Sequence, residues 1–168
     1  MGNEKAGGII ALIGAILTLV STFLPVAQIN WNFFGVRLDV YYWIWGFYYA
    51  RSSGWGETVT ETGFDLEIYG VICGSIIVLA AIIAMVKSNS ARKGDGGGAV
   101  LLIMGILAII AMVSWIILID IIYAEEYSLF GENVRISFWS FFEFSYGIYL
   151  LFGGAILLIV GAIIVMTS

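Results

Sequence analysis

Two arginines with matching neighbours are the first candidates for chemistry in this sequence. Arg37 lies in the segment FGVRLDVYYW (34–43) and Arg135 lies in FGENVRISFW (130–139). Each segment reads Phe-Gly, a short step, Val-Arg-aliphatic, and then aromatic residues that end in Trp. Together the two guanidinium groups could bind an anion or a lipid headgroup. The simpler interpretation, which we favour, is that each arginine pairs with a nearby acid, such as Asp39, and stacks on a neighbouring ring.

Asp120 is the second candidate, because it is the only acid inside a long apolar run. Ionisable side chains at membrane depth usually have a function. Asp120 and the two arginines could therefore lie on the path of a small transporter or channel. However, Asp120 is close to Tyr123, at the expected water-facing end of its helix, and this position favours a structural or interfacial role.

The expected loops are rich in aromatic residues, among them Trp43 and Trp45 in the first loop and Trp139 in the second. Such rings could hold a quinone, a lipid tail or a sugar, or could anchor a protein partner. Trp and Tyr near a membrane more commonly form the interfacial belt. We favour the belt and the packing of the loops themselves, and keep these three tryptophans as candidate partner-binding residues.

The composition argues against most catalytic and metal chemistry. The chain has no His and a single Cys. Without His, acid–base catalysis near neutral pH lacks its commonest agent. A disulfide cannot form within the chain, and a zinc site would need carboxylates alone, which zinc rarely accepts. We therefore expect a protein that is not an enzyme, with no cofactor, no metal and no nucleic-acid partner. An enzyme that acts on lipids is the least favoured alternative.

The same composition predicts an integral membrane protein. Of the chain, 61% is hydrophobic and 11% is charged, and the mean hydropathy is +1.03; a soluble domain cannot bury so much apolar surface. About 20 helical residues cross a hydrocarbon core about 30 Å thick. We expect a single transmembrane domain in contact with membrane lipids. Its expected helices are 6–26, 67–87, 98–122 and 143–166, joined by outer loops at 27–66 and 123–142 and by a cytoplasmic turn at 88–97.

The loops contain predicted structure of their own. Apolar and polar residues alternate over 36–44, which is the period of a strand, and the Thr-rich stretch 57–62 predicts a second strand at a sheet edge. The T-x-x-D motif at 62–65 and the S-x-x-E motif at 140–143 resemble capping boxes that open the following helices. The expected fold class is an all-α membrane protein, a four-helix bundle with a small extracellular antiparallel β-sheet built from both outer loops.

The two arginine segments also indicate an internal duplication, in which the unit of helix, strand-bearing loop and helix occurs twice. Both units have the same orientation, so a pseudo-twofold axis would run along the membrane normal. From this duplication we predict that Arg37 and Arg135 lie on two strands of one sheet.

Small residues recur on single helical faces and predict close packing between helices. No helix carries a run of polar side chains, so a compact bundle without a wide pore is expected. The glycines expected at helix contacts are Gly14, Gly70, Gly74, Gly105, Gly154 and Gly161.

Positive charge predicts the orientation. Lys87, Arg92 and Lys93 surround the short turn, whereas the long loops are rich in acids. The positive-inside rule places such a turn in the cytoplasm. The N- and C-termini are then cytoplasmic as well, and both long loops lie outside the plasma membrane.

The layout resembles the claudin-like superfamily of four-helix membrane proteins. Local matches are Leu-Pro (24–25) at the end of the first span, Trp31 soon after it, and Trp-Ile-Trp-Gly (43–46) near the place of that family's Gly-Leu-Trp. The two loop cysteines of the family are absent here. The resemblance implies a left-handed four-helix bundle, a sheet in the loops, and lateral or face-to-face self-association.

These observations lead to one main functional hypothesis. We expect a non-enzymatic integral membrane protein that mediates assembly or adhesion through its aromatic outer loops and its small-residue helix faces. It would act as a homo-oligomer or as an accessory subunit of a larger membrane complex. The alternative is a small transporter or channel with Asp120, Arg37 and Arg135 on the path.

Overall fold

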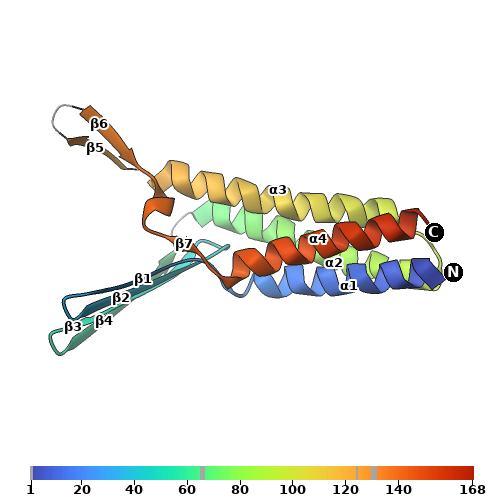
Figure 1. Cartoon of the computed structure of the whole chain (residues 1–168), viewed down its shortest axis with the longest axis horizontal. Coiled ribbons are helices and arrows are strands. Elements are labelled where there is room, and N and C mark those ends of the chain that lie inside the picture. Colours follow the sequence, from blue (N-terminus) through green and yellow to red (C-terminus); the bar gives the residue numbers. More distant parts are fainter. Residues whose placement is uncertain (1, 65–66, 124, 130–131) are drawn as a thin grey trace.

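The molecule consists of four long helices with a β-sheet at one end of the bundle (Figure 1). The computed structural model describes residues 2–64, 67–123, 125–129 and 132–168. All four helices are long and apolar enough to cross a membrane, so the predicted multi-pass membrane protein is confirmed. The helices are α1 (Gly2–Ser21), α2 (Glu67–Lys93), α3 (Gly98–Tyr123) and α4 (Tyr146–Met166).

The bundle has a core of two parts. Helices α1 and α3 each contact both α2 and α4. Toward the termini, the buried side chains are mostly small, such as Ala11, Ala84 and Ala162. Toward the sheet they are large, and include Trp115 and Met112. The helices can therefore lie close together at one end and enclose bulky side chains at the other.

Glycines bring α1 and α4 close together. A Cβ added at Gly14 would lie 2.6 Å from the carbonyl oxygen of Gly154, and one added at Gly161 would lie 2.6 Å from the carbonyl oxygen of Gly7. On α3, a Cβ at Gly105 would lie 2.8 Å from Ile159 of α4. These contacts leave no room for a side chain, so the glycine faces of α1 and α4 are used inside the bundle.

Gly70 and Gly74 of α2 face a different neighbour. A Cβ at Gly70 would lie 2.6 Å from the backbone nitrogen of Gly46, and one at Gly74 would lie 2.6 Å from the Trp45 ring. These glycines therefore make room for the turn that carries Trp45, and not for another helix.

The sheet is antiparallel and confirms the predicted fold class. Its strands are β1 (Pro25–Phe33), β2 (Val36–Trp43), β3 (Phe47–Gly54), β4 (Glu57–Phe64) and the short β7 (Glu143–Phe144). Their order is β4-β3-β2-β1-β7. Four strands come from the first loop and β7 comes from the second. The predicted Thr-rich edge strand is β4, at one border of this sheet.

The prediction that Arg37 and Arg135 share a sheet is wrong. Arg135 lies on β6 (Glu132–Ile136), which pairs with β5 (Glu125–Leu129) in a separate two-stranded sheet. Figure 1 shows this hairpin beyond the end of α3, apart from the larger sheet. Pairing between neighbours in the chain closes a shorter loop and costs less entropy. The sequence repeat therefore does not produce paired strands.

Several predicted helix boundaries are also wrong. The first helix ends at Ser21 and not at residue 26. The Ser21 hydroxyl donates to the carbonyl oxygen of Thr18 (2.6 Å), and Pro25, which lacks an N–H group, begins β1. Apolar composition continued past this point, so hydropathy alone could not place the boundary.

The fourth helix begins at Tyr146 and not at Glu143. Glu143 pairs with Gln28 of β1 as part of β7, and Ser145 takes the N-cap position. The Ser145 hydroxyl donates to Gln28 Oε1 (2.9 Å) and does not cap the helix. Glu143 of the predicted S-x-x-E box therefore lies in the sheet and Ser140 lies in a short 3-10 helix, and the predicted T-x-x-D box ends at Asp65, outside the described residues.

The turn between the second and third helices is shorter than predicted. Helix α2 continues to Lys93, and α3 begins at Gly98. Gly94, Gly96 and Gly97 have φ values of +88°, +72° and +111°. Such left-handed backbone favours glycine, so these glycines allow the chain to reverse within a few residues.

Gly154→Ala should lower the free energy of unfolding by about 1–3 kcal/mol. The new Cβ would lie 2.7 Å from the backbone nitrogen of Thr18 and 2.8 Å from the Gly14 carbonyl oxygen. The matched control is Gly153→Ala, since a Cβ at Gly153 meets nothing within 4 Å. It should be neutral or slightly stabilising, because Ala favours the helix. Unfolding in mild detergent measures both, and equal losses would contradict the proposed α1–α4 contact.

Candidate functional site

Two tryptophans hold the sheet against the end of α1. Trp43 Nε1 donates to the carbonyl oxygen of Phe23 (3.1 Å), and Trp45 Nε1 donates to that of Thr22 (2.9 Å). Carbonyl groups at a helix C-terminus have no partner within the helix. The two indole N–H groups therefore satisfy acceptors at the membrane boundary and fix the position of the rings.

A hollow of about 470 Å³ lies beside these two rings. Phe23 and Phe64, which border it, are both mostly exposed. The hollow is almost entirely apolar and lies at the ends of membrane spans, so it suits a lipid acyl chain. Its lining residues are Thr22, Phe23, Trp43, Trp45, Phe47, Phe64 and Val71.

Trp139 makes the corresponding bond in the second half of the chain. Its Nε1 donates to the carbonyl oxygen of Ile116 in α3 (3.2 Å). Trp139 matches Trp43 in the repeated segment. Each donates to a backbone carbonyl group in or just after the helix that precedes its own loop, since Phe23 lies two residues past the end of α1 and Ile116 lies inside α3. The repeated tryptophan thus has one structural role in both halves, although the repeated arginine does not.

Asp120 holds the backbone of the second loop. Its Oδ1 accepts hydrogen bonds from the Ser137 hydroxyl and from the backbone N–H of Phe138 (2.9 Å). The Ser137 hydroxyl oxygen in turn accepts from the backbone N–H of Trp139 (3.2 Å). These bonds fix the start of the short 3-10 helix η1 (Phe138–Ser140). This geometry supports the structural interpretation of Asp120.

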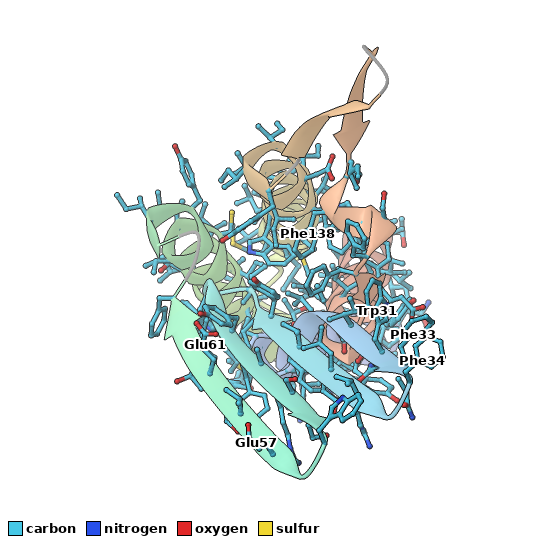
Figure 2. All side chains as sticks on the ribbon, turned by 90° about the vertical axis from the view of Figure 1, so that its left-hand side faces the viewer. Trp31, Phe33, Phe34, Glu57, Glu61 and Phe138 are labelled. Carbon is cyan, nitrogen blue, oxygen red and sulfur yellow. The ribbon has the colours of Figure 1, made fainter. Side chains whose placement is uncertain are left out.

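An aromatic box joins the sheet, α3 and η1. The Tyr42 ring lies edge-to-face against Phe138 (5.7 Å between ring centres) and Phe142 (5.3 Å), and also contacts Tyr123 (6.4 Å). Phe138 and Phe142 stack 4.1 Å apart. Viewed from the sheet end, Phe138 lies over the helix bundle (Figure 2). A cavity of about 250 Å³ lies beside these rings, and the ring contacts themselves stabilise the sheet on the bundle.

Arg37 forms the ion pair that the sequence predicted. Its Nε lies 2.8 Å from Asp39 Oδ2, while its own side chain stays 64% exposed. Asp39 is buried, and its Oδ1 has no hydrogen-bond partner among the described residues. Arg135 lies on a strand of the other sheet, so the sheet register does not bring the two arginines together.

The sequence interpretation missed the exposed aromatic residues of the first loop as a group. Trp31, Phe33, Phe34 and Trp55 are 50%, 70%, 87% and 91% exposed. Figure 2 shows the first three together at one side of the sheet. Phe34 and Trp55 are each followed by a glycine next to a predicted strand, and this was the available signal, because glycine beside a strand pattern marks a turn.

Among the residues that the structure describes, no group of three or more acidic or Cys side chains is placed to hold a metal ion. The single cysteine, Cys73, is buried in α2.

Asp120→Ala should lower the free energy of unfolding by about 2–3 kcal/mol, because the Ser137 hydroxyl and the Phe138 N–H lose a charged acceptor. Asp120→Asn keeps an acceptor oxygen of the same reach and should lose less than half as much. Amide exchange at Phe138 should accelerate in the alanine variant and change little in the asparagine variant. Unchanged Phe138 exchange in Asp120→Ala would contradict the structural role.

No protein-family model matches the chain, and no curated protein matches its sequence. What the structure establishes is four long apolar helices with a small antiparallel sheet. The resemblance to claudin-like proteins is therefore one of layout.

Proposed function

We propose that this membrane protein is not an enzyme, and that its sheet mediates assembly with a second copy or with another membrane protein. The observation that carries the proposal is the open edge of β1. Strand β7 pairs with β1 only at Ala27 and Gln28. Beyond Gln28, no described strand pairs with β1 on that side.

The open edge is aromatic as well as unpaired. Trp31 and Phe33 are at least half exposed, and a hollow of about 530 Å³ runs along Asn30, Trp31, Asn32 and Phe33. Exposed strand edges offer backbone N–H and C=O groups to another chain. Exposed aromatic side chains are typical anchors of protein interfaces. A partner strand or loop can therefore gain hydrogen bonds and apolar contact on one surface.

The opposite edge of the sheet has a different character. Strand β4 is Thr-rich and carries Glu57 and Glu61, which Figure 2 shows on the side of the sheet away from Trp31 and Phe33. Charged residues on an edge strand discourage pairing with another chain. The two edges therefore favour association through β1 and not through β4.

The helix surfaces have a different part in this proposal. The glycines of α1 and α4 already face each other inside the bundle. The outward surfaces carry large apolar side chains such as Ile13, Ile110 and Ile163, which contact lipid. We therefore assign assembly to the sheet and not to the small-residue helix faces.

Assembly is favoured over transport because of the surroundings of Asp120. Its carboxylate accepts hydrogen bonds from Ser137 and Phe138, and Arg37 pairs with Asp39 in the sheet. A transport path would need these groups to face permeating solute. They serve instead to hold local structure.

We further propose that the sheet lies outside the plasma membrane and that both termini are cytoplasmic. The termini and the turn between α2 and α3 are at the end of the bundle away from the sheet (Figure 1). Lys5, Lys87, Arg92 and Lys93 lie at that end. Clusters of Lys and Arg in short connections stay on the cytoplasmic side.

Replacing Trp31 and Phe33 together by Ser should weaken assembly at least tenfold. The pair contributes exposed apolar area on the open edge, and removing two interface aromatics typically costs at least tenfold in affinity, about 1.4 kcal/mol. Crosslinking in native membranes and mass photometry in mild detergent measure the change.

The matched control for this assembly test is Val59→Ser, on the opposite edge strand, where the side chain is 63% exposed. It should leave assembly unchanged. A wild-type protein that is strictly monomeric, with no co-purifying membrane protein, would sink the assembly proposal.

Labelling of introduced cysteines should reveal the orientation. The native Cys73 is buried and should give little background. Thr58→Cys on β4 should react with a membrane-impermeant maleimide in intact cells, whereas Asn89→Cys at the end of α2 should react only after permeabilisation. Both native side chains are exposed, so accessibility is matched. The reverse labelling pattern would refute the proposed orientation.

A further inference from the structure

Two turns of the sheet share an unusual construction. The β1–β2 turn is Phe34-Gly35 and the β3–β4 turn is Trp55-Gly56, each a two-residue connection between paired strands. The φ values are +48° and +79° in the first turn and +55° and +88° in the second. Two successive positive φ values are the pattern of a type I′ turn, which favours Asn-Gly or Asp-Gly.

An aromatic residue is a poor choice for the first position of such a turn. Side chains with a Cβ rarely adopt left-handed backbone, and bulky ones least of all. Burial does not offset this cost, since Phe34 and Trp55 are 87% and 91% exposed. Among the described residues they are the most exposed large apolar side chains. The same unfavourable choice at two turns points to a binding role.

Both turns lie at the end of the sheet farthest from the helices (Figure 1). Strands β2, β3 and β4 have 8 residues each. At about 3.3 Å per residue, such strands carry the turns roughly 25 Å beyond the membrane end of the sheet. The two turns are separated by two strand spacings, about 10 Å. Phe34 and Trp55, here called the tip rings, therefore project away from the protein's own membrane as two separate points.

The region around the tip rings is electrically balanced, although the whole chain carries a net charge of −5. In the outer halves of the four strands, Arg37 and Arg51 stand against Asp39 and Glu57. An uncharged tip can approach a lipid surface without electrostatic repulsion, and it has no excess positive charge to select anionic lipid.

We propose that Phe34 and Trp55 insert into the headgroup region of a second, facing bilayer of zwitterionic lipid. Two separated, protruding rings suit a fluid surface that closes around each of them, whereas a protein partner would need two matching pockets. Trp and Phe are favoured at the boundary between headgroups and acyl chains. The proposal rests on the proposed function in one respect, because it requires the sheet to lie outside the membrane.

The test uses the full-length protein held in amphipol, so that the sample brings no bilayer of its own, together with protein-free phosphatidylcholine vesicles. The wild-type protein should co-float with the vesicles. The affinity of the double variant Phe34→Asn/Trp55→Asn for the vesicles should be lower by roughly tenfold or more, because two apolar rings are lost from the lipid contact. Its melting temperature should be no lower than that of the wild type, since Asn-Gly suits both turns.

The matched control is Val59→Asn, on the β4 edge of the same sheet and outside the two turns, where the side chain is 63% exposed. It should co-float like the wild type, which separates tip insertion from general stickiness of the apolar protein. Vesicles with added phosphatidylserine should bind no better than phosphatidylcholine alone. A requirement for the anionic lipid would overturn the proposal.

Two further outcomes separate this proposal from the assembly role. If the wild type fails to co-float but forms oligomers by mass photometry, tip insertion is overturned and assembly stands. Co-flotation that is equal in the wild type and the double variant also overturns tip insertion. If the wild type neither co-floats nor associates with itself or with another membrane protein, both proposals fail.

Discussion

Backbone carbonyl groups at the end of a membrane helix need hydrogen-bond donors, and at the end of α1 two indole N–H groups supply them. Trp43 and Trp45 bond to the carbonyl groups of Phe23 and Thr22, which directly follow α1, and Trp139 adds a bond to a carbonyl group inside α3. A polar group left unpaired at the edge of a bilayer is costly. Because the chain has one cysteine, no internal disulfide can hold the sheet. The position of the sheet on the bundle therefore depends on these bonds and on the aromatic box around Tyr42.

This dependence divides the aromatic residues into two groups with different physical roles. The rings of Tyr42, Phe138 and Phe142 contact one another and stabilise the junction between sheet and helices. Trp55 is 91% exposed, and Trp31 is half exposed with an edge contact to Phe141, so they contribute less to that junction. Apolar groups left in water lower stability and solubility unless a partner covers them. The stability of the fold therefore does not explain the exposed aromatic residues, and a binding role is best assigned to them.

The sequence was informative wherever one physical signal dominated. Long apolar runs predicted the four helices, and alternation predicted the strand after Val36, because lipid contact and half-burial each impose a simple pattern. Predicted helix boundaries were wrong where two sequence signals conflicted. At Pro25, for example, an apolar run passes from helix into strand. The prediction that the strands of Arg37 and Arg135 share one sheet was wrong, since pairing depends on which strand edges are free and not on matching sequence. The exposure of Phe34 could not be predicted, because local composition does not reveal whether another segment covers a turn.

The sequence repeat is best understood through what its two copies do alike. In both, the final tryptophan donates to a backbone carbonyl group in or just after the preceding helix, so the repeat encodes the attachment of a loop to its helix. The rest of each loop is different. The first forms four strands of one sheet, whereas the second forms the separate β5–β6 hairpin, η1 and the short strand β7, which pairs with β1 only at Ala27 and Gln28. Because β7 is so short, it leaves the outer part of β1 open. The length of that one strand thus determines how much of the sheet edge is available to a partner, and it links the architecture of the second loop to the proposed function of the first.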